Sequence, residues 1–160
     1  MMSGSGAAAI PAPPAVACEL RVTPSAVAGQ PVQLTVRLRN AGTSVLQLLT
    51  WGTPFEEGWF HPFVVVTHNG RALSYGGASV KRADPSADEY LRFAPGQRRQ
   101  ATLDLADVFN VSAPGRYVVE PRVVIHDVLA APGRPPRPRA QHQALHPACR
   151  GATFEITPAR

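Results

Sequence analysis

The chain has 160 residues, of which 44% are hydrophobic and 17% are charged, as expected for one globular domain and not for a disordered chain. Its 17 prolines disfavour long helices, and no apolar run is long enough for a membrane-spanning helix. The net charge is +5, and Lys81 is the only lysine among the sixteen basic residues. The arginines are dispersed apart from a cluster of Arg134, Arg137 and Arg139, and no aromatic residues interleave with that cluster, so we expect no nucleic-acid partner.

The N-terminal residues 1–17 are small and rich in alanine and proline. They contain no basic stretch followed by an apolar core, so they are not an intact signal peptide. Ala15-Val16-Ala17 nevertheless has the small-residue pattern of a cleavage site. We therefore expect a leader remnant or an added tail at 1–17, and a single folded domain over 18–160.

From Cys18 onward, short alternating runs are separated by turn residues. In 31–39, Val32, Leu34, Val36 and Leu38 share one face, which is typical of a strand buried on one side. Asn69-Gly70 predicts a tight hairpin, because both residues adopt positive φ readily. The other strand-like runs are 18–22, 45–51, 63–68, 71–75, 90–93, 99–105, 116–125 and 152–156. This series predicts an all-β fold, an antiparallel immunoglobulin-like β-sandwich.

The same alternation predicts the core. Beyond the 31–39 set, we expect these side chains to be buried: Val64, Val66, Leu103, Leu105, Val118 and Phe154. Pro121 cannot donate a ladder hydrogen bond, so it predicts an edge strand or a bulge within 116–125. The Pro/Arg-rich segment 130–148 predicts a long exposed loop with polyproline character.

Cys18 lies at the start of the first expected strand, and Cys149 lies just before the last one. These strands are often neighbours in a sandwich, so we predict a Cys18–Cys149 disulfide; the alternative is two reduced thiols that never meet. A bridge would place the protein in an oxidising compartment, secreted or periplasmic.

The titratable side chains form no complete catalytic or metal constellation. A histidine beside an aspartate at 126–127 has no nucleophile in a suitable context, and the adjacent carboxylates at 56–57 are expected to be solvated. His142, His146 and Cys149 have ligand chemistry but lack the fourth ligand of a structural zinc site. We expect no enzyme activity, no cofactor and no metal.

Two loops hold the candidate binding residues. The loop at 51–62 places Trp59 and Phe60 among glycines and prolines, and rigid aromatic loops suit interfaces. The alternative is that these rings close the end of the core. The loop at 76–89 carries Lys81 and Arg82, for which the alternative is a solvated dibasic turn. We predict that these four residues form a partner-binding face.

The middle of the chain resembles a known family, over roughly residues 19–125. The segments that carry the resemblance are, in order, Trp51-Gly52-Thr53-Pro54, Asn69-Gly70-Arg71, Val80-Lys81-Arg82 and Pro114-Gly115-Arg116-Tyr117. Their order and spacing are similar to those of the N-terminal, non-catalytic β-domain of deuterolysin-like zinc metallopeptidases, a group that includes lysine-specific endopeptidases. The sequence has no His-Glu-x-x-His motif, so the resemblance implies a free-standing propeptide-like domain and not a protease.

The resemblance implies a non-enzymatic domain that acts in trans on a protease, as an inhibitor or a detached propeptide-like domain. The expected partner is then a protein, with a metallopeptidase as the first candidate. For a lysine-selective protease, Lys81 is the residue expected to enter the specificity pocket. The alternative function is an adhesive or structural module that binds another protein or a glycan.

Overall fold

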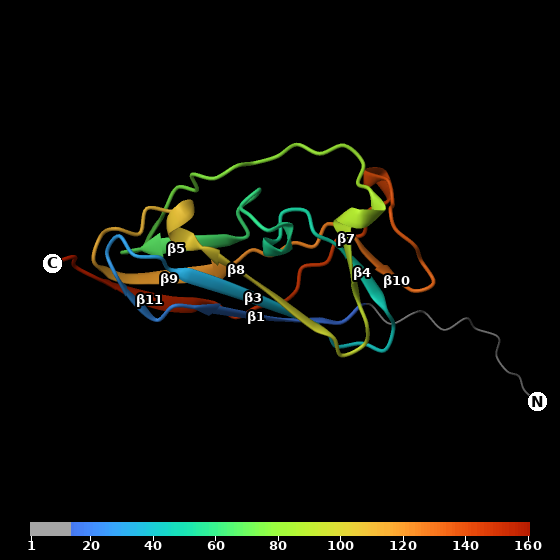
Figure 1. Ribbon diagram of the computed structural model, residues 1–160, viewed down its shortest axis with the longest axis horizontal. Helices are drawn as coiled ribbons and strands as arrows, with labels where there is room; N and C mark the ends of the chain where they lie inside the picture. Colours follow the sequence, from blue (N-terminus) through green and yellow to red (C-terminus); the bar gives the residue numbers. More distant parts are fainter. Residues whose placement is uncertain (1–13) are drawn as a thin grey trace, which may run out of the picture.

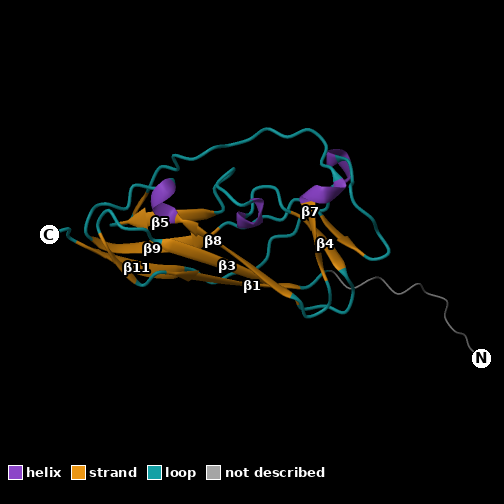
Figure 2. Ribbon diagram, viewed as in Figure 1, coloured by secondary structure: helices purple, strands orange, loops and turns teal. Residues whose placement is uncertain are grey.

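Residues 14–160 of the computed structural model form an all-β fold (Figures 1 and 2). Most of the expected tail, residues 1–13, lies outside the described residues. The first strand, β1 (Val16–Val22), begins two residues before the boundary expected at Cys18. No helix in the described part is long and apolar enough to cross a membrane.

Three sheets make up this fold. The first has the order β1-β3-β8, with β3 at Gln33–Asn40 and β8 at Arg98–Asp104. The second has the order β2-β11-β9-β5-β6, and its strands are Ser25–Val27, Ala152–Thr157, Gly115–Pro121, Val64–His68 and Arg71–Ala72. The third has the order β10-β4-β7, with strands at Val128–Ala130, Leu46–Leu49 and Tyr90–Phe93. Neighbouring strands are antiparallel except β2 and β11, which are parallel.

Most of the core lies between the first two sheets, which form the sandwich, and the third sheet adds Leu46, Leu48, Phe93 and Val128 to the same cluster. Alternate residues of β3 point inward, as expected, and meet the inward residues of β5, β9 and β11 in one cluster. Within it the rings of Tyr117 and Phe154 stack with their centroids 4.8 Å apart. The all-β prediction is confirmed, while the immunoglobulin-like subtype stays a prediction.

The prediction for β9 was wrong by one residue. Tyr117 and Val119 are fully buried, whereas Val118 is 37% exposed. The Tyr-Val-Val run offers apolar side chains to either face, and a shift of one residue exchanges the faces. Burial of the large Tyr117 ring decides the register. Leu103 is half-buried and packs against the core without being enclosed by it.

Pro121 lies neither on an edge strand nor in a bulge. It is the last residue of β9, which is a central strand between β11 and β5, and it pairs with Val64. The ladder ends there, and the next amide, that of Arg122, donates to the carbonyl of Phe63 at 2.7 Å. A proline is tolerated because the strand stops where its missing donor would be needed.

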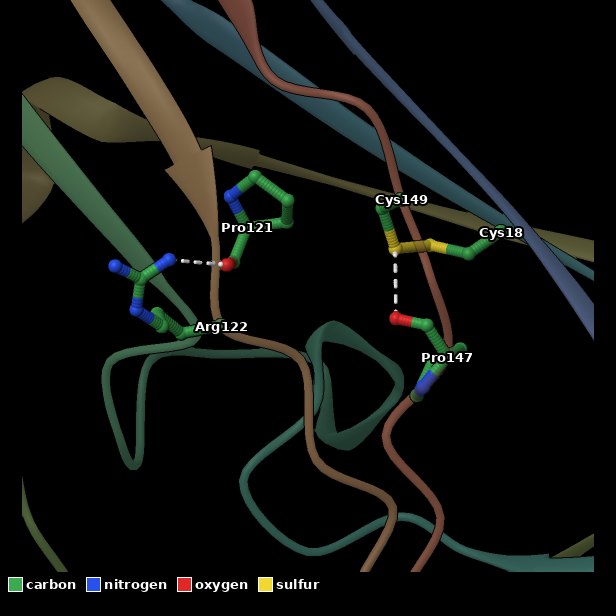
Figure 3. Close-up of a disulfide and its surroundings, with 5 residues drawn as sticks. All are labelled: Cys18, Pro121, Arg122, Pro147 and Cys149. Carbon is green, nitrogen blue, oxygen red and sulfur yellow. Dashed lines mark hydrogen bonds between the residues drawn. A yellow bond between two sulfur atoms is a disulfide. The ribbon is translucent and has the colours of Figure 1, made fainter.

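Two local predictions are confirmed. Asn69 and Gly70 have φ values of 54° and 77° and connect β5 to β6. Cys18 of β1 and Cys149, just before β11, form a disulfide with their Cα atoms 4.8 Å apart (Figure 3). The bridge joins the first sheet to the chain that enters the second sheet, so it crosses the two layers of the sandwich.

Candidate protein-binding face

Three loops converge at the end of the molecule that contains the third sheet. The chain that follows β6 runs along the length of the molecule to reach β7, and the 130–148 segment lies beside it there (Figure 1). The backbone amide of Val80 donates to the carbonyl of Phe60, and Arg139 Nη1 donates to the carbonyl of Arg82 at 2.6 Å. The loops 51–62, 76–89 and 130–148 therefore form one continuous surface.

The 51–62 loop is organised around Glu56. A short 3-10 helix, η1 (Pro54–Glu56), is capped by Thr53, whose hydroxyl accepts from the amide of Phe55. The Glu56 carboxylate accepts from the Gly52 amide at 2.6 Å and from Arg82 Nη2 at 2.5 Å, and its side chain is only 9% exposed. The expectation of two solvated carboxylates was thus wrong for Glu56, while Glu57 is exposed.

Trp59 lies in the core. It is 9% exposed, its ring stacks on Phe63 at 4.5 Å, and its Nε1 donates to the carbonyl of Asp104 at 3.1 Å. A buried indole needs such an acceptor, and here the backbone supplies it. This position fits the alternative in which the ring closes the end of the core, and it leaves Trp59 outside the exposed surface of these loops. The sequence did not predict the stacking of Trp59 on Phe63. A spacing of four residues places two side chains on one face only in a helix, and neither residue is in a helix.

Arg82 anchors the 76–89 loop. Its guanidinium lies 5.3 Å from the centroid of the Trp51 ring and 5.9 Å from that of Phe60. It forms ion pairs with Glu56 and, at 3.5 Å, with Glu89. Stacking on aromatic rings and pairing with two carboxylates fix the guanidinium and neutralise its charge. Arg82 therefore positions the loop and contributes little net charge to a partner.

Lys81 differs from its neighbour Arg82 because its side chain is exposed and is not fixed by ion pairs among the described residues. It is exposed and makes no ion pair or side-chain hydrogen bond within residues 14–160. Its neighbour Val80 is 47% exposed, the most exposed of the three large apolar residues that are exposed among the described residues. The loop thus presents a flexible ammonium group and an apolar side chain from a backbone that Arg82 holds. We call the surface formed by Phe60, Val80, Lys81 and Arg82 the Lys81 face.

A buried carboxylate fixes the 130–148 segment. Asp127 is fully buried and accepts from both Nε and Nη2 of Arg137, from the Tyr90 hydroxyl at 2.7 Å and from the Gln143 amide at 3.0 Å. It therefore does not pair with the adjacent His126. The segment is largely exposed, as expected, but Arg137 attaches it to the third sheet, where its Nη2 also donates to the carbonyl of Val128.

The same contacts set the pKa values of this region. Burial opposes ionisation of Asp127, but the hydrogen bonds from Arg137, Gln143 and Tyr90 outweigh it and lower its pKa. Burial and the hydrogen bond to Asp127 raise the pKa of Tyr90 to about 12, so its hydroxyl remains a donor at neutral pH. The hydrogen bond from Trp51 Nε1, followed by that from the Ser86 amide, lowers the pKa of Glu89.

A pocket of about 490 Å³ opens between the three loops. Its lining combines rings with basic side chains and includes Trp51, Phe60, His61, Lys81, His126 and Arg139. Sequence reasoning found Phe60 and Lys81 but missed His61, His126 and Arg139, because these residues come from three segments that only the fold brings together. His142 also lines the pocket; its Nε2 lies 2.9 Å from the carbonyl of Arg137.

The three residues considered as zinc ligands, His142, His146 and Cys149, cannot bind a metal ion together. Cys149 is bonded to Cys18, so its sulfur cannot act as a thiolate ligand. Among the described residues, no group of three or more His, Cys, Asp or Glu side chains is placed to hold a metal ion.

Comparison with known proteins places part of this chain near an extracellular protease. No family model matches the chain. An extracellular protease of Aeromonas hydrophila is 31% identical over 88 residues, which make up 55% of this chain and 25% of that protease. The chain thus spans about a quarter of the length of the curated relative it matches. This similarity gives the chain a protease-associated context, and together with the disulfide it fits an extracellular location.

Proposed function

We propose that this chain is a secreted, non-enzymatic β-sandwich domain that binds a protease in trans, as an inhibitor or a detached propeptide-like domain. The similarity to part of an extracellular protease supports a protease as the partner. The observation that carries the proposal is the Lys81 face, where a lysine without an ion pair in the described chain projects from a braced loop.

The fixed backbone on both sides of Lys81 supports the proposed role as an inhibitory loop. The backbone bond from Val80 to Phe60 and the ion pairs of Arg82 hold the residues on both sides of Lys81. A loop that is ordered before binding loses little conformational entropy when the complex forms. The Lys81 ammonium suits a specificity pocket that contains a carboxylate, as in a lysine-selective protease. We place Lys81 in that pocket, with Phe60 and Val80 against its rim.

The experiment measures binding to the mature extracellular protease of Aeromonas hydrophila, immobilised on a biosensor surface. Lys81→Ala would leave the protease carboxylate buried without its cation, which costs ~2–5 kcal/mol and weakens affinity roughly 30-fold or more. Arg71→Ala is the matched control, because Arg71 is also an exposed basic residue but lies in the β5–β6 hairpin. It should bind as the parent does.

A parallel assay of casein hydrolysis distinguishes an inhibitor from a propeptide-like domain that assists folding. Dose-dependent inhibition by the parent chain supports an inhibitor, whereas improved refolding of denatured protease without inhibition supports a propeptide-like assistant. Failure of the parent chain to bind the protease contradicts the proposal, and binding to immobilised glycans in its place would favour an adhesive module.

A further inference from the structure

The pocket behind the Lys81 face carries only basic and neutral side chains among its described lining residues. The carboxylates nearby are already engaged. Glu56 and Glu89 pair with Arg82, and Asp84 accepts the backbone amide of Arg139 at 2.9 Å. The charges that remain available in the pocket are therefore positive, from Lys81 and Arg139 and from its histidines when these are protonated.

Two histidines, His61 and His126, both lie against Gly52 at one wall of the pocket. Gly52 has φ +69°, and a Cβ atom added to it would lie 3.4 Å from Cβ of His61 and 3.6 Å from Nε2 of His126. Both histidines are exposed, and neither ring makes a hydrogen bond within residues 14–160. Ring nitrogens without protein partners, on the wall of a pocket, can donate to an anion.

Apolar surface adjoins these donors. Phe60 is half-buried and Val80 is 47% exposed, and both line the pocket together with the histidines. A volume of about 490 Å³ lies within the usual range of small-ligand sites. The lining therefore matches a ligand that combines a negative charge with an apolar group.

We propose that this pocket binds a carboxylate attached to an apolar group, with His61, Lys81 and His126 as the donors and Phe60 and Val80 as the apolar contacts. Two sources present this chemistry, a small organic acid and the C-terminus of a peptide that ends in an apolar residue. The site does not depend on the proposed protease partner, because its ligand can be tested with the isolated chain.

The test uses phenylacetate as the probe and phenylacetamide as its neutral isostere. Histidine ring resonances are followed by NMR during titration of the chain. We expect phenylacetate to shift the ring signals of His61 and His126 with a dissociation constant on the order of 1 mM, and phenylacetamide to leave them unchanged. A peptide ending in phenylalanine, with a free or an amidated C-terminus, forms the second arm.

Two variants test the donors. The exposed His126 and Lys81 are replaced in a His126→Gln/Lys81→Gln double variant, which keeps polar side chains and removes the lysine charge and the titratable imidazole. Arg71→Gln serves as the control. The double variant should bind phenylacetate at least about tenfold more weakly, whereas the control should match the parent. Unchanged thermal unfolding of the double variant would show that the loss arises at the site.

Each outcome decides the proposal. Equal binding of acid and amide, or no shift with either carboxylate, overturns it, as does a double variant that binds like the parent. Selective binding of the acids supports it, and their relative affinities assign the source. A free peptide C-terminus that binds about tenfold more tightly than phenylacetate identifies a peptide ligand, and similar affinities identify a small acid.

Discussion

The loops at one end of this molecule are fixed in a different way from the strands of its body. The sandwich body, formed by the β1-β3-β8 sheet and the five-stranded sheet, is filled by apolar side chains and crossed by the disulfide. At the loop end, the β10-β4-β7 sheet has a smaller apolar cluster of Leu49, Trp51, Tyr90 and Leu129. The loops 51–62, 76–89 and 130–148 around it are fixed in addition by Arg82 with its two carboxylates and by Arg137 with Asp127.

This difference means that the stability of the fold and the shape of the loop surface depend on different interactions. Apolar burial is non-directional, so it holds layers together without fixing the course of a loop. Ion pairs and hydrogen bonds are directional, and a buried pair contributes more to a unique arrangement than to net stability. The body thus provides a stable support, and the loop end provides a surface of defined shape whose contacts depend on charge.

The largest expected effect is on the body. The disulfide joins residues separated by 131 positions, so a Cys18→Ser/Cys149→Ser variant should lose about 4–5 kcal/mol of unfolding free energy, because the unfolded chain gains the entropy of an open loop. Guanidinium unfolding of the oxidised parent and the variant measures the difference. A loss below about 1 kcal/mol would show that the bridge contributes little.

The next effect should appear at the loop end. Asp127→Ala leaves Arg137 without its carboxylate in a largely buried position, which should cost about 3–5 kcal/mol. Leu38→Ala in the body, where the side chain is 1% exposed, should cost a similar ~2–5 kcal/mol through a cavity. Comparing the unfolding free energies of these two variants separates the contribution of the ion pair from that of apolar packing.

A fall in pH should distinguish the Asp127→Ala variant from the Leu38→Ala variant. Because the pKa of Asp127 is lowered in the folded protein, its ionisation stabilises the fold above the unfolded value of ~4, and this contribution is lost as pH falls through the lower, folded value. The stability gap between the parent and Asp127→Ala should therefore narrow below pH ~4, whereas the gap for Leu38→Ala should not. Parallel changes in both gaps would contradict the role of charge.

A smaller, local effect is expected for Arg82→Met. This substitution keeps the aliphatic stem but removes the ion pairs and the cation–π contacts, and we expect a loss of about 1–2 kcal/mol. Hydrogen exchange should accelerate in the loops 51–62 and 76–89 and remain slow in β3 and β9. Faster exchange in all strands would mean that the loop end and the body unfold together.

The smallest effect is the pH dependence of phenylacetate binding. Loss of hydration and the neighbouring basic groups lower the pKa of His126 in the free protein, and a bound carboxylate would raise it again. The basic or titratable groups around this pocket are His61, Lys81, Arg82, Arg139, His142 and His146. The carboxylates are Glu56 and Glu89 on Arg82, Asp84 at the amide of Arg139, and Asp127, which lies 4.0 Å from His142 Nε2. Affinity should increase a few-fold between about pH 8 and 6, and a decrease would contradict the assigned donors.

The sequence predicted the body better than the loop end. Period-two alternation located β3, the Asn-Gly pair located the β5–β6 hairpin, and the positions of Cys18 and Cys149 predicted the bridge. Each of these features is local or depends on chain order. The error at Val118 arose where three consecutive residues were suitable for burial, so that the alternation alone did not fix the register.

The loop end depends on pairs that no local pattern reveals. Glu56 and Arg82 are 26 positions apart, and the sequence marks neither as the partner of the other. Arg137 and Asp127 are closer in the sequence, but the composition of the 130–148 segment resembles that of a free loop and does not reveal the single arginine that attaches it.

Two short strands, β2 and β10, were not predicted either, because three residues are too few to show alternation.

The disulfide also determines how the molecule would carry mechanical load. A force applied to the two ends of the chain passes from residues before Cys18 through the sulfur–sulfur bond to Cys149 and on into β11. The 130 residues between the cysteines form a covalently closed loop that lies outside this path. The Lys81 face is part of that loop, so tension on the two ends of the chain would not stretch its backbone.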